Sequence, residues 1–328
     1  MGWATLGAGR ESRNRARPGI IAGLSEYAGN ERMAAPDVTD IAGIWPMLYA
    51  FFDADGGLDR AALGLASEVN KLDVGERRAF LDCVAEALGG RLPLAVTIAE
   101  PSISGQRAFA AAAEAAGARW LILQPPPVSG ASEAELVRFF GAVADTTPLP
   151  VAIQNAPQYI GVGLGNQALA TLARQHPNLC LLKAEGPPVY IERLIAETEG
   201  RFRVFNGRAG LELTESLRVG CAGLIPGAES ADVQSAIYDL ARAGRWDRAE
   251  AMFRDLLPLI AFLMDSIPHL VCYGKRLAAR RMGLGPVHDR APAHAPTDYG
   301  LDLLDRLARG LGPLAARAGR AALSRDRA

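Results

Sequence analysis

The sequence predicts an α/β protein of the TIM, or (β/α)8, barrel class with a helical C-terminal extension. The 328-residue chain is 49% hydrophobic, which is enough for one large domain or two ordinary ones. From residue 41 onward, short apolar runs alternate with longer amphipathic stretches. This alternation is typical of parallel βαβ units, and the expected strand ends recur at intervals of 20 to 30 residues.

Each expected strand is apolar on both faces, as in a sheet that helices cover. The runs are 41–52, 92–98, 119–124, 149–154, 179–183, 202–206 and 222–227. Helical patterns separate them at 76–90, 105–118, 132–146 and 166–178. A doubly wound sheet would tolerate the same spacing. A barrel is favoured because no GxGxxG follows the first strand, and GVGLG (161–165) comes after a strand and a proline turn.

We expect four segments along the chain. Residues 1–38 are expected as a disordered N-terminal extension, 39–228 as the barrel, 229–312 as the helical extension and 313–328 as a frayed tail. The first segment is rich in Arg, Gly and Ser without an apolar core, so it does not resemble a secretory signal. A mitochondrial presequence has a similar composition, but Met33 also suits a natural start, and we expect a cytoplasmic protein.

Composition narrows the classes of partner. The net charge of −1 gives no reason to expect nucleic acid or an anionic membrane surface. The sequence contains no run of 18 apolar residues, so we expect no membrane span. The four cysteines form no CxxC pair and are expected as buried free thiols. The four histidines lack metal-ligand spacing, so we expect neither a metal nor another cofactor.

Lysine is scarce in this chain, with only Lys71, Lys183 and Lys275. Lys183 ends an otherwise apolar strand, and the carboxyl ends of barrel strands carry the catalytic residues. Burial there disfavours the ammonium ion and favours a free amine that can attack a carbonyl. The alternative is a lysine that reaches solvent or pairs with Glu185. Lys275 is expected as a solvated helix lysine, and Glu68 and Lys71 as structural or rim charges.

Several motifs carry a resemblance to a known family. LPVAIQNAPQYIGVGL (149–164) and PNLCLLKAEGP (177–187), with GLASEVNKLDVGERR (64–78), NGRAGLEL (206–213) and GCAGLIPG (220–227), resemble the dihydrodipicolinate synthase and N-acetylneuraminate lyase superfamily. The resemblance covers about residues 41–265. It implies a class I aldolase or dehydratase that needs no cofactor, acts on a 2-keto acid through Lys183 and forms dimers or tetramers.

The departures from the family pattern bear on the reaction. The family's proton-relaying tyrosine falls on Gln154, which cannot serve as an acid or base at neutral pH. Its two threonines fall on Leu65 and Ala66. Ser67 could supply one hydroxyl, and the backbone N–H groups of Ala66 and Ser67 could still hold a carboxylate. The arginine of true dihydrodipicolinate synthases falls on Tyr159, which argues against condensation of pyruvate with aspartate semialdehyde.

A glutamine at the tyrosine position occurs in a branch that resembles 2-keto-3-deoxy-L-arabonate dehydratases, in which the Schiff base of a sugar acid loses water. Glu185 lies two residues beyond Lys183 and is expected on the same face of the strand. Gln154, Glu185 and Ser67 are therefore the candidates for positioning water or moving protons.

Further residues are expected to bind the substrate. Arg208, after the seventh strand of the family pattern, could hold a sugar-acid carboxylate through a bidentate contact, although a surface arginine is the plainer interpretation. Tyr159 follows a proline turn near the barrel mouth, and Ile225 belongs to the eighth-strand motif. Both are expected to line the pocket.

One interval is too short for the family pattern. Between Ala50 and Gly64 the family places a loop, a helix and a second strand, yet only residues 51–63 are available. Most of the first helix and the second strand are therefore expected to be shortened or missing, which would leave unpaired sheet edges.

Two functional interpretations follow. The first is a Schiff-base lyase, a dehydratase or an aldolase, that acts through Lys183 on a 2-keto acid or a 2-keto-3-deoxy sugar acid. The second is a non-catalytic relative that binds a keto acid or a partner subunit. The lost threonines, the lost tyrosine and the short interval favour the second. The reactivity of Lys183 separates the two, because a binding module needs no reactive amine.

Overall fold

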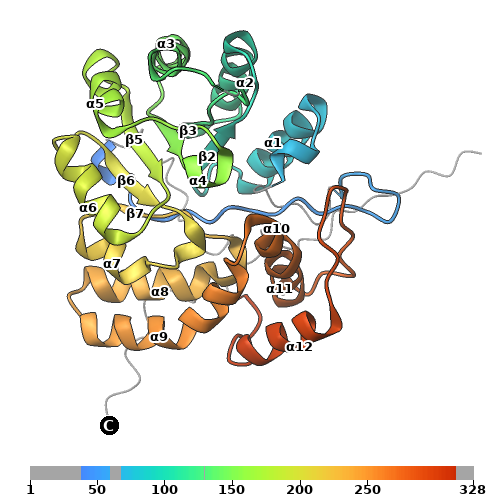
Figure 1. Ribbon diagram of the computed structural model, residues 1–328. Helices are drawn as coiled ribbons and strands as arrows, with labels where there is room; N and C mark the ends of the chain where they lie inside the picture. Colours follow the sequence, from blue (N-terminus) through green and yellow to red (C-terminus); the bar gives the residue numbers. More distant parts are fainter. Residues whose placement is uncertain (1–37, 60–67, 129, 315–328) are drawn as a thin grey trace, which may run out of the picture.

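A computed structural model describes residues 38–59, 68–128 and 130–314 of the chain. Seven parallel strands form one sheet in the order β1-β7-β6-β5-β4-β3-β2. They are β1 (Gly43–Ile44), β2 (Leu94–Ile98), β3 (Ala118–Leu123), β4 (Val151–Asn155), β5 (Leu179–Ala184), β6 (Arg203–Asn206) and β7 (Gly223–Leu224). The sheet curls, and helices lie outside it (Figure 1). The barrel predicted from the apolar runs is confirmed.

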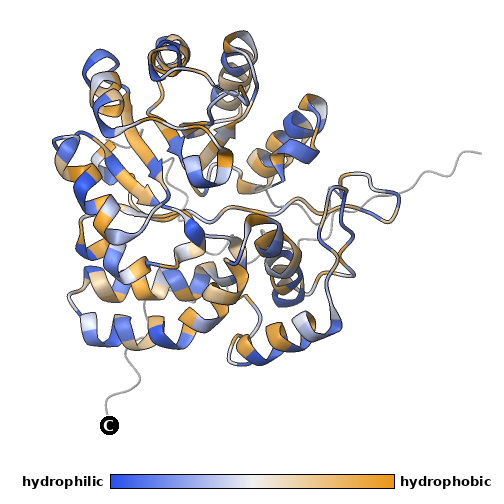
Figure 2. Cartoon of the chain, viewed as in Figure 1, coloured by the Kyte–Doolittle hydropathy of each residue, from blue (hydrophilic) through white to orange (hydrophobic). Residues whose placement is uncertain are grey.

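Helices follow the strands, and most of them cover the outer face of the sheet (Figure 1). They are α1 (Val74–Leu88), α2 (Ile103–Ala115), α3 (Glu133–Ala144), α4 (Pro157–Ile160), α5 (Asn166–Gln175), α6 (Pro188–Glu197), α7 (Leu213–Arg218) and α8 (Ala231–Arg242). Their apolar residues face the strands and their polar residues face outward (Figure 2). Two helices begin with complete capping boxes, Asp73 with Glu76 in α1 and Ser132 with Glu135 in α3.

The helical extension packs on α8, on the side of the molecule opposite α2, α3 and α5 (Figure 1). It consists of α9 (Trp246–Leu263), α10 (Ile267–His269), a π-helical turn (Leu270–Gly274), α11 (Lys275–Met282) and α12 (Asp298–Leu307). Within the described residues no single helix is long and apolar enough to cross a membrane. The pair Trp246–Leu263 and Ile267–Met282 would reach that length together, by length and composition only, with a bend of 105°.

Aromatic side chains fill the inside of the curled sheet. The Trp120 ring stacks on Phe205 with 5.5 Å between centroids and meets Trp45 edge-on at 5.3 Å. Trp120 and Phe205 are fully buried among aliphatic side chains of the neighbouring strands. Large side chains inside a small barrel make a packed core, so the space left for a ligand lies toward the strand ends.

The short interval has the structural consequence that the sequence predicts. β1 pairs with β7, β2 pairs with β3, and among the described residues no strand lies between β1 and β2. Beyond β1 the extended chain still follows β7, since Met47 forms a bridge with Gly227. The Tyr49 hydroxyl then donates to Glu229 at 2.6 Å, and burial raises the pKa of both groups.

Lys275 corrects one expectation. It is fully buried rather than solvated, with Nζ 2.7 Å from Glu68 Oε2 and 3.4 Å from Asp289 Oδ1. It also donates to the Ala50 carbonyl at 3.1 Å. Glu68 is equally buried and accepts from Lys71, which makes it a structural charge as expected. The expectation failed because two partners of Lys275, Ala50 and Glu68, lie more than 200 residues away in the chain.

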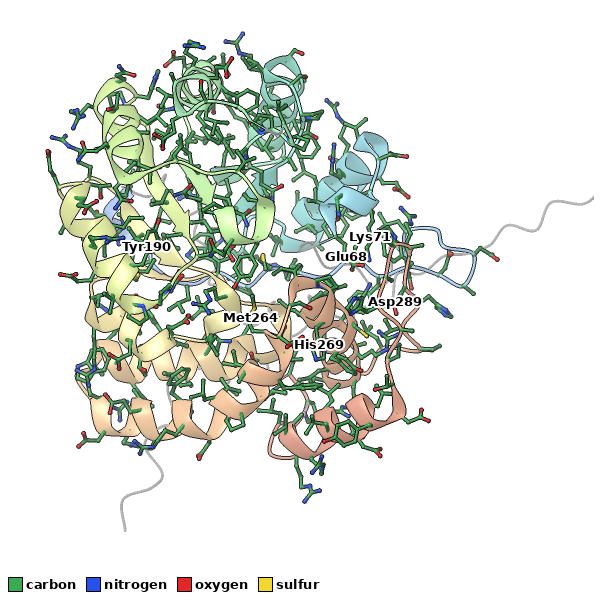
Figure 3. All side chains as sticks on the ribbon, viewed as in Figure 1. Glu68, Lys71, Tyr190, Met264, His269 and Asp289 are labelled. Carbon is green, nitrogen blue, oxygen red and sulfur yellow. The ribbon has the colours of Figure 1, made fainter. Side chains whose placement is uncertain are left out.

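This buried cluster joins the barrel to the helical extension. Glu68, Lys71 and Asp289 meet between α1 and α11 (Figure 3).

All four cysteines of the chain are free; Cys221 and Cys272 are buried, whereas Cys83 and Cys180 are half-buried. The assignment of 39–228 and 229–312 to separate segments stays a prediction, and α8 itself packs against β1.

Candidate active site

A cavity of about 850 Å³ runs from the carboxyl ends of the strands to the amino end of β2, where Leu92, Pro93 and Leu94 line it. Its walls are largely apolar, with Met47, Ile225 and Tyr159 among the lining residues. The polar side chains that line it near the carboxyl ends of the strands include Gln124, Gln154, Lys183, Glu185 and Arg208. An apolar cleft with a few convergent polar groups is the usual form of a small-molecule site.

Lys183 lies inside this cavity with only 3% of its surface exposed. β5 pairs with β4 and β6 on either side, which places Lys183 between Gln154 and Phe205 in register. The Nζ atom lies 3.5 Å from Glu185 Oε1 and 3.4 Å from the Met47 sulfur. The amine therefore contacts one anionic group and the Met47 sulfur, and little of its side chain is exposed.

Glu185 belongs to a hydrogen-bonded chain of side chains. Gln124 Nε2 donates to Gln154 Oε1 at 2.9 Å, and Gln154 Nε2 donates to Glu185 Oε1 at 2.9 Å. The carbonyl of Gln154 thus faces Gln124 and its amide faces the carboxylate. Since the same carboxylate oxygen lies next to Lys183, the chain runs from Gln124 to the amine.

Side chains from β6 and α4 hold the backbone around Glu185, in the loop after β5. The side-chain amide of Asn206 accepts from the Gly186 N–H at 3.2 Å and donates to its carbonyl at 3.0 Å. Gln158 donates to the Glu185 carbonyl. Gly207 leaves room for the carboxylate, because a Cβ there would lie 2.8 Å from Glu185 Cγ. The acid is therefore held from both neighbouring strands.

Arg208 also lines the cavity, but its guanidinium is already paired. Nη1 lies 2.7 Å from Glu212 Oε1, on the next turn of the chain. Arg208 and Ala209 both have φ of 52°, a left-handed conformation that non-glycine residues rarely adopt. Burial raises the pKa of Glu212, whereas the neighbouring Arg208 lowers it.

The structure brings most of the predicted site residues to one cavity. Glu185 contacts both Lys183 and Gln154, and Arg208, Ile225 and Tyr159 line the same cavity. Ala66 and Ser67 lie outside the described residues. Among the described residues, no cluster of His, Cys, Asp and Glu could hold a metal ion.

Sequence reasoning missed two residues of the site, Gln124 and Glu212. Gln124 ends an apolar strand as Gln154 does, so its position at a strand end was the available signal. Glu212 lies four residues after Arg208, but the turn between them is irregular, so helical spacing alone would not have identified the pair.

Comparison with known proteins agrees with the fold. Residues 53–298 match the dihydrodipicolinate synthetase family. The dihydrodipicolinate synthase of Rhodopseudomonas palustris superposes with a TM-score of 0.75 at 22% identity, over 85% of this chain and 100% of that one. This likeness supports the barrel with its helical extension.

Curated relatives carry different activities in their names. A 4-hydroxy-tetrahydrodipicolinate synthase of Methanosphaerula palustris is 26% identical over 76% of this chain and 85% of its own length. An L-2-keto-3-deoxyarabonate dehydratase of Azospirillum brasilense is 28% identical, over 66% and 78%. A Coccidioides immitis protein that carries the name of a mitochondrial 4-hydroxy-2-oxoglutarate aldolase is 31% identical, over 63% and 68%.

Proposed function

Because the chain belongs to the dihydrodipicolinate synthetase family, we propose that it is a lyase whose Lys183 forms a Schiff base with a 2-keto acid or a 2-keto-3-deoxy sugar acid. The observation that carries this proposal is the burial of Lys183 at the end of β5, beside Glu185 and inside the cavity. We place the reaction among dehydrations and aldol cleavages, and we favour dehydration.

In the proposed reaction, Lys183 first loses a proton, for which Glu185 at 3.5 Å is the nearest base. The free amine adds to the C2 carbonyl, and loss of water gives the protonated imine. This iminium draws electrons from C3, so a base can remove a C3 proton and leave an enamine. In dehydration, the electron pair of the enamine then expels the C4 hydroxyl as water. In a substrate with a C5 hydroxymethyl group, loss of a C5 proton and return of a proton to C3 give an enol at C4–C5, which takes a proton at C4 and becomes the aldehyde. Hydrolysis of the imine returns Lys183.

Dehydration is favoured because cleavage and dehydration need different proton transfers. Cleavage of the C3–C4 bond requires a base at the C4 hydroxyl, which must lose its proton. Dehydration instead requires an acid at that hydroxyl and a base at C3. Glu185 can take the C3 proton and return it to the leaving hydroxyl, whereas Gln154 can only orient groups through hydrogen bonds.

We further propose that the enzyme is not a true dihydrodipicolinate synthase. Gln154 and Tyr159 stand where the family resemblance places the synthase's tyrosine and arginine. In the same proposal Arg208, Tyr159 and Ile225 contact the substrate, and Ala66 and Ser67 hold its carboxylate. We also propose a cytoplasmic dimer or tetramer, which light scattering of the purified chain would test.

The reaction products test the proposal. The protein is incubated with L-2-keto-3-deoxyarabonate, and the mixture is followed by proton NMR. Dehydration keeps all five carbons and yields a keto acid with a terminal aldehyde, whereas cleavage yields pyruvate and a two-carbon aldehyde. The proposal expects the five-carbon product. If neither this substrate nor any other 2-keto acid is turned over or bound covalently by the folded protein, the lyase proposal fails.

Replacement of the general base tests its role. Glu185→Gln should lower kcat by about 100-fold or more, because the amide cannot move a proton. Formation of a reducible adduct with pyruvate should persist, although more slowly. Steady-state kinetics and borohydride trapping measure the two effects. Glu192→Gln, an exposed change on α6, serves as the control. A Glu185→Gln enzyme with wild-type kcat would contradict the assignment.

Replacement of Gln124, at the outer end of the hydrogen-bonded chain of side chains, should lower kcat less than replacement of Glu185. Gln124→Leu removes the donor that orients the Gln154 amide, and one net hydrogen bond contributes about 1 kcal/mol. We therefore expect kcat to fall about fivefold with little change in protein stability. The exposed Gln175→Leu is the matched control. Equal kcat values for the two variants would show that Gln124 does not position the site.

A further inference from the structure

Three charged pairs border the cavity, and in each pair the charges compensate. Lys183 lies next to Glu185, and Arg208 next to Glu212. Asp232, which also lines the cavity, receives Arg281 through both Nη atoms at 2.9 and 2.7 Å. Among the described lining residues, no cation is therefore left to balance a second carboxylate on a ligand.

The Arg208–Glu212 pair is held in place by its surroundings. Consecutive left-handed residues are costly for side chains other than glycine, so they persist only where the fold determines them. Here the Gln234 side chain, fully buried, donates to the Ala209 carbonyl at 2.9 Å. Arg208 Nε and Glu212 Oε2 are buried without a hydrogen-bond partner in the described part of the chain. The pair therefore presents a charge-compensated guanidinium at the cavity wall.

We propose that Glu212 determines specificity: by its ion pair with Arg208, it makes this wall of the cavity select a substrate with a terminal hydroxyl over one with a terminal carboxylate. A hydroxyl can accept from the Arg208 guanidinium, which lines the cavity, without bringing a second negative charge close to Glu212. A second carboxylate would compete with Glu212 for Arg208 and be repelled by it. This inference rests on the proposed Schiff-base function.

Two five-carbon acids provide a matched test. L-2-keto-3-deoxyarabonate and 4-hydroxy-2-oxoglutarate of the same C4 configuration differ only at C5, which is a hydroxymethyl group in the first and a carboxylate in the second. The readout is the concentration of each acid that gives half-maximal borohydride trapping on Lys183. This readout needs adduct formation but no turnover. Pyruvate, which has no C4 or C5, is trapped in parallel.

The wild-type protein should prefer the hydroxymethyl acid by at least about tenfold, which corresponds to about 1.4 kcal/mol. Glu212→Gln should shift this ratio about tenfold toward the dicarboxylate. Glu215→Gln, an exposed change on the same helix, should leave the ratio unchanged. Arg208→Gln removes the cation instead, so it should move the ratio in the opposite direction to Glu212→Gln.

The outcomes separate the two proposals. If neither pyruvate nor either five-carbon acid is trapped by the folded wild-type protein, the Schiff-base function itself fails. If pyruvate is trapped but the wild type prefers the dicarboxylate, the specificity inference is overturned alone. The same holds if the ratio stays fixed in Glu212→Gln. Should that variant not fold, Arg208→Gln decides, since an unchanged ratio there also overturns the inference.

Discussion

Lys183→Arg should lose activity by about 1,000-fold or more, because a guanidinium keeps the positive charge but cannot form an imine. Lys183 is buried next to Glu185, so the arginine variant preserves the charge balance better than an alanine would. Activity on 2-keto acids is measured by steady-state kinetics and adduct formation by borohydride trapping. Both should disappear together, whereas a variant affected only in substrate binding would recover at high substrate concentration.

Lys71→Arg is the control for this change. Lys71 is nearly as buried, with 8% of its side chain exposed, but its partner is Glu68 and it is not among the residues in contact with Glu185. It should retain trapping and turnover. Activity that survives in Lys183→Arg would mean that another group carries the chemistry.

Lys275→Met should destabilise the protein by about 1–3 kcal/mol, because it removes the buried cation between Glu68 and Asp289, although Lys71 and Arg276 still pair with these carboxylates. Glu68 and Asp289 lie 2.7 and 3.4 Å from the lysine amine, and Glu68 is fully buried. Urea unfolding followed by circular dichroism measures the loss. The loss of stability should be smaller when the Glu68 charge is removed in the same molecule. The double variant Glu68→Gln with Lys275→Met should therefore recover part of the stability.

An exposed ion pair on the same helix provides the comparison. Arg280 pairs with Asp305, and both side chains are about half exposed. Arg280→Met should cost less than about 1 kcal/mol. Equal losses for Arg280→Met and Lys275→Met would show that the buried cluster contributes no more than a surface pair.

The repeating part of the fold could be predicted because its signals are local. Apolar runs at regular intervals identified the seven strands, and the two-residue period of a strand placed Glu185 on the same side as Lys183. Among the described residues, the lack of a strand between β1 and β2 was predictable too, since chain length alone excludes a full helix and a strand between Ala50 and Gly64.

The rest depends on contacts between distant parts of the chain. Nothing near Lys275 indicates that it meets Glu68, more than 200 residues earlier. An amphipathic helix with several arginines favoured a solvated lysine instead. Likewise, the sequence offers Arg208 as a ligand for a carboxylate or as a surface arginine, because the left-handed turn that brings Glu212 to it has no clear sequence signal.

Reductive trapping with pyruvate tests the central claim most directly. The protein is treated with pyruvate and borohydride, digested, and mapped by mass spectrometry. Since the chain has only three lysines, each can be assigned. We predict a reduced adduct on Lys183 and none on Lys71 or Lys275. A folded protein without an adduct, or with its adduct on another lysine, would contradict the Schiff-base account.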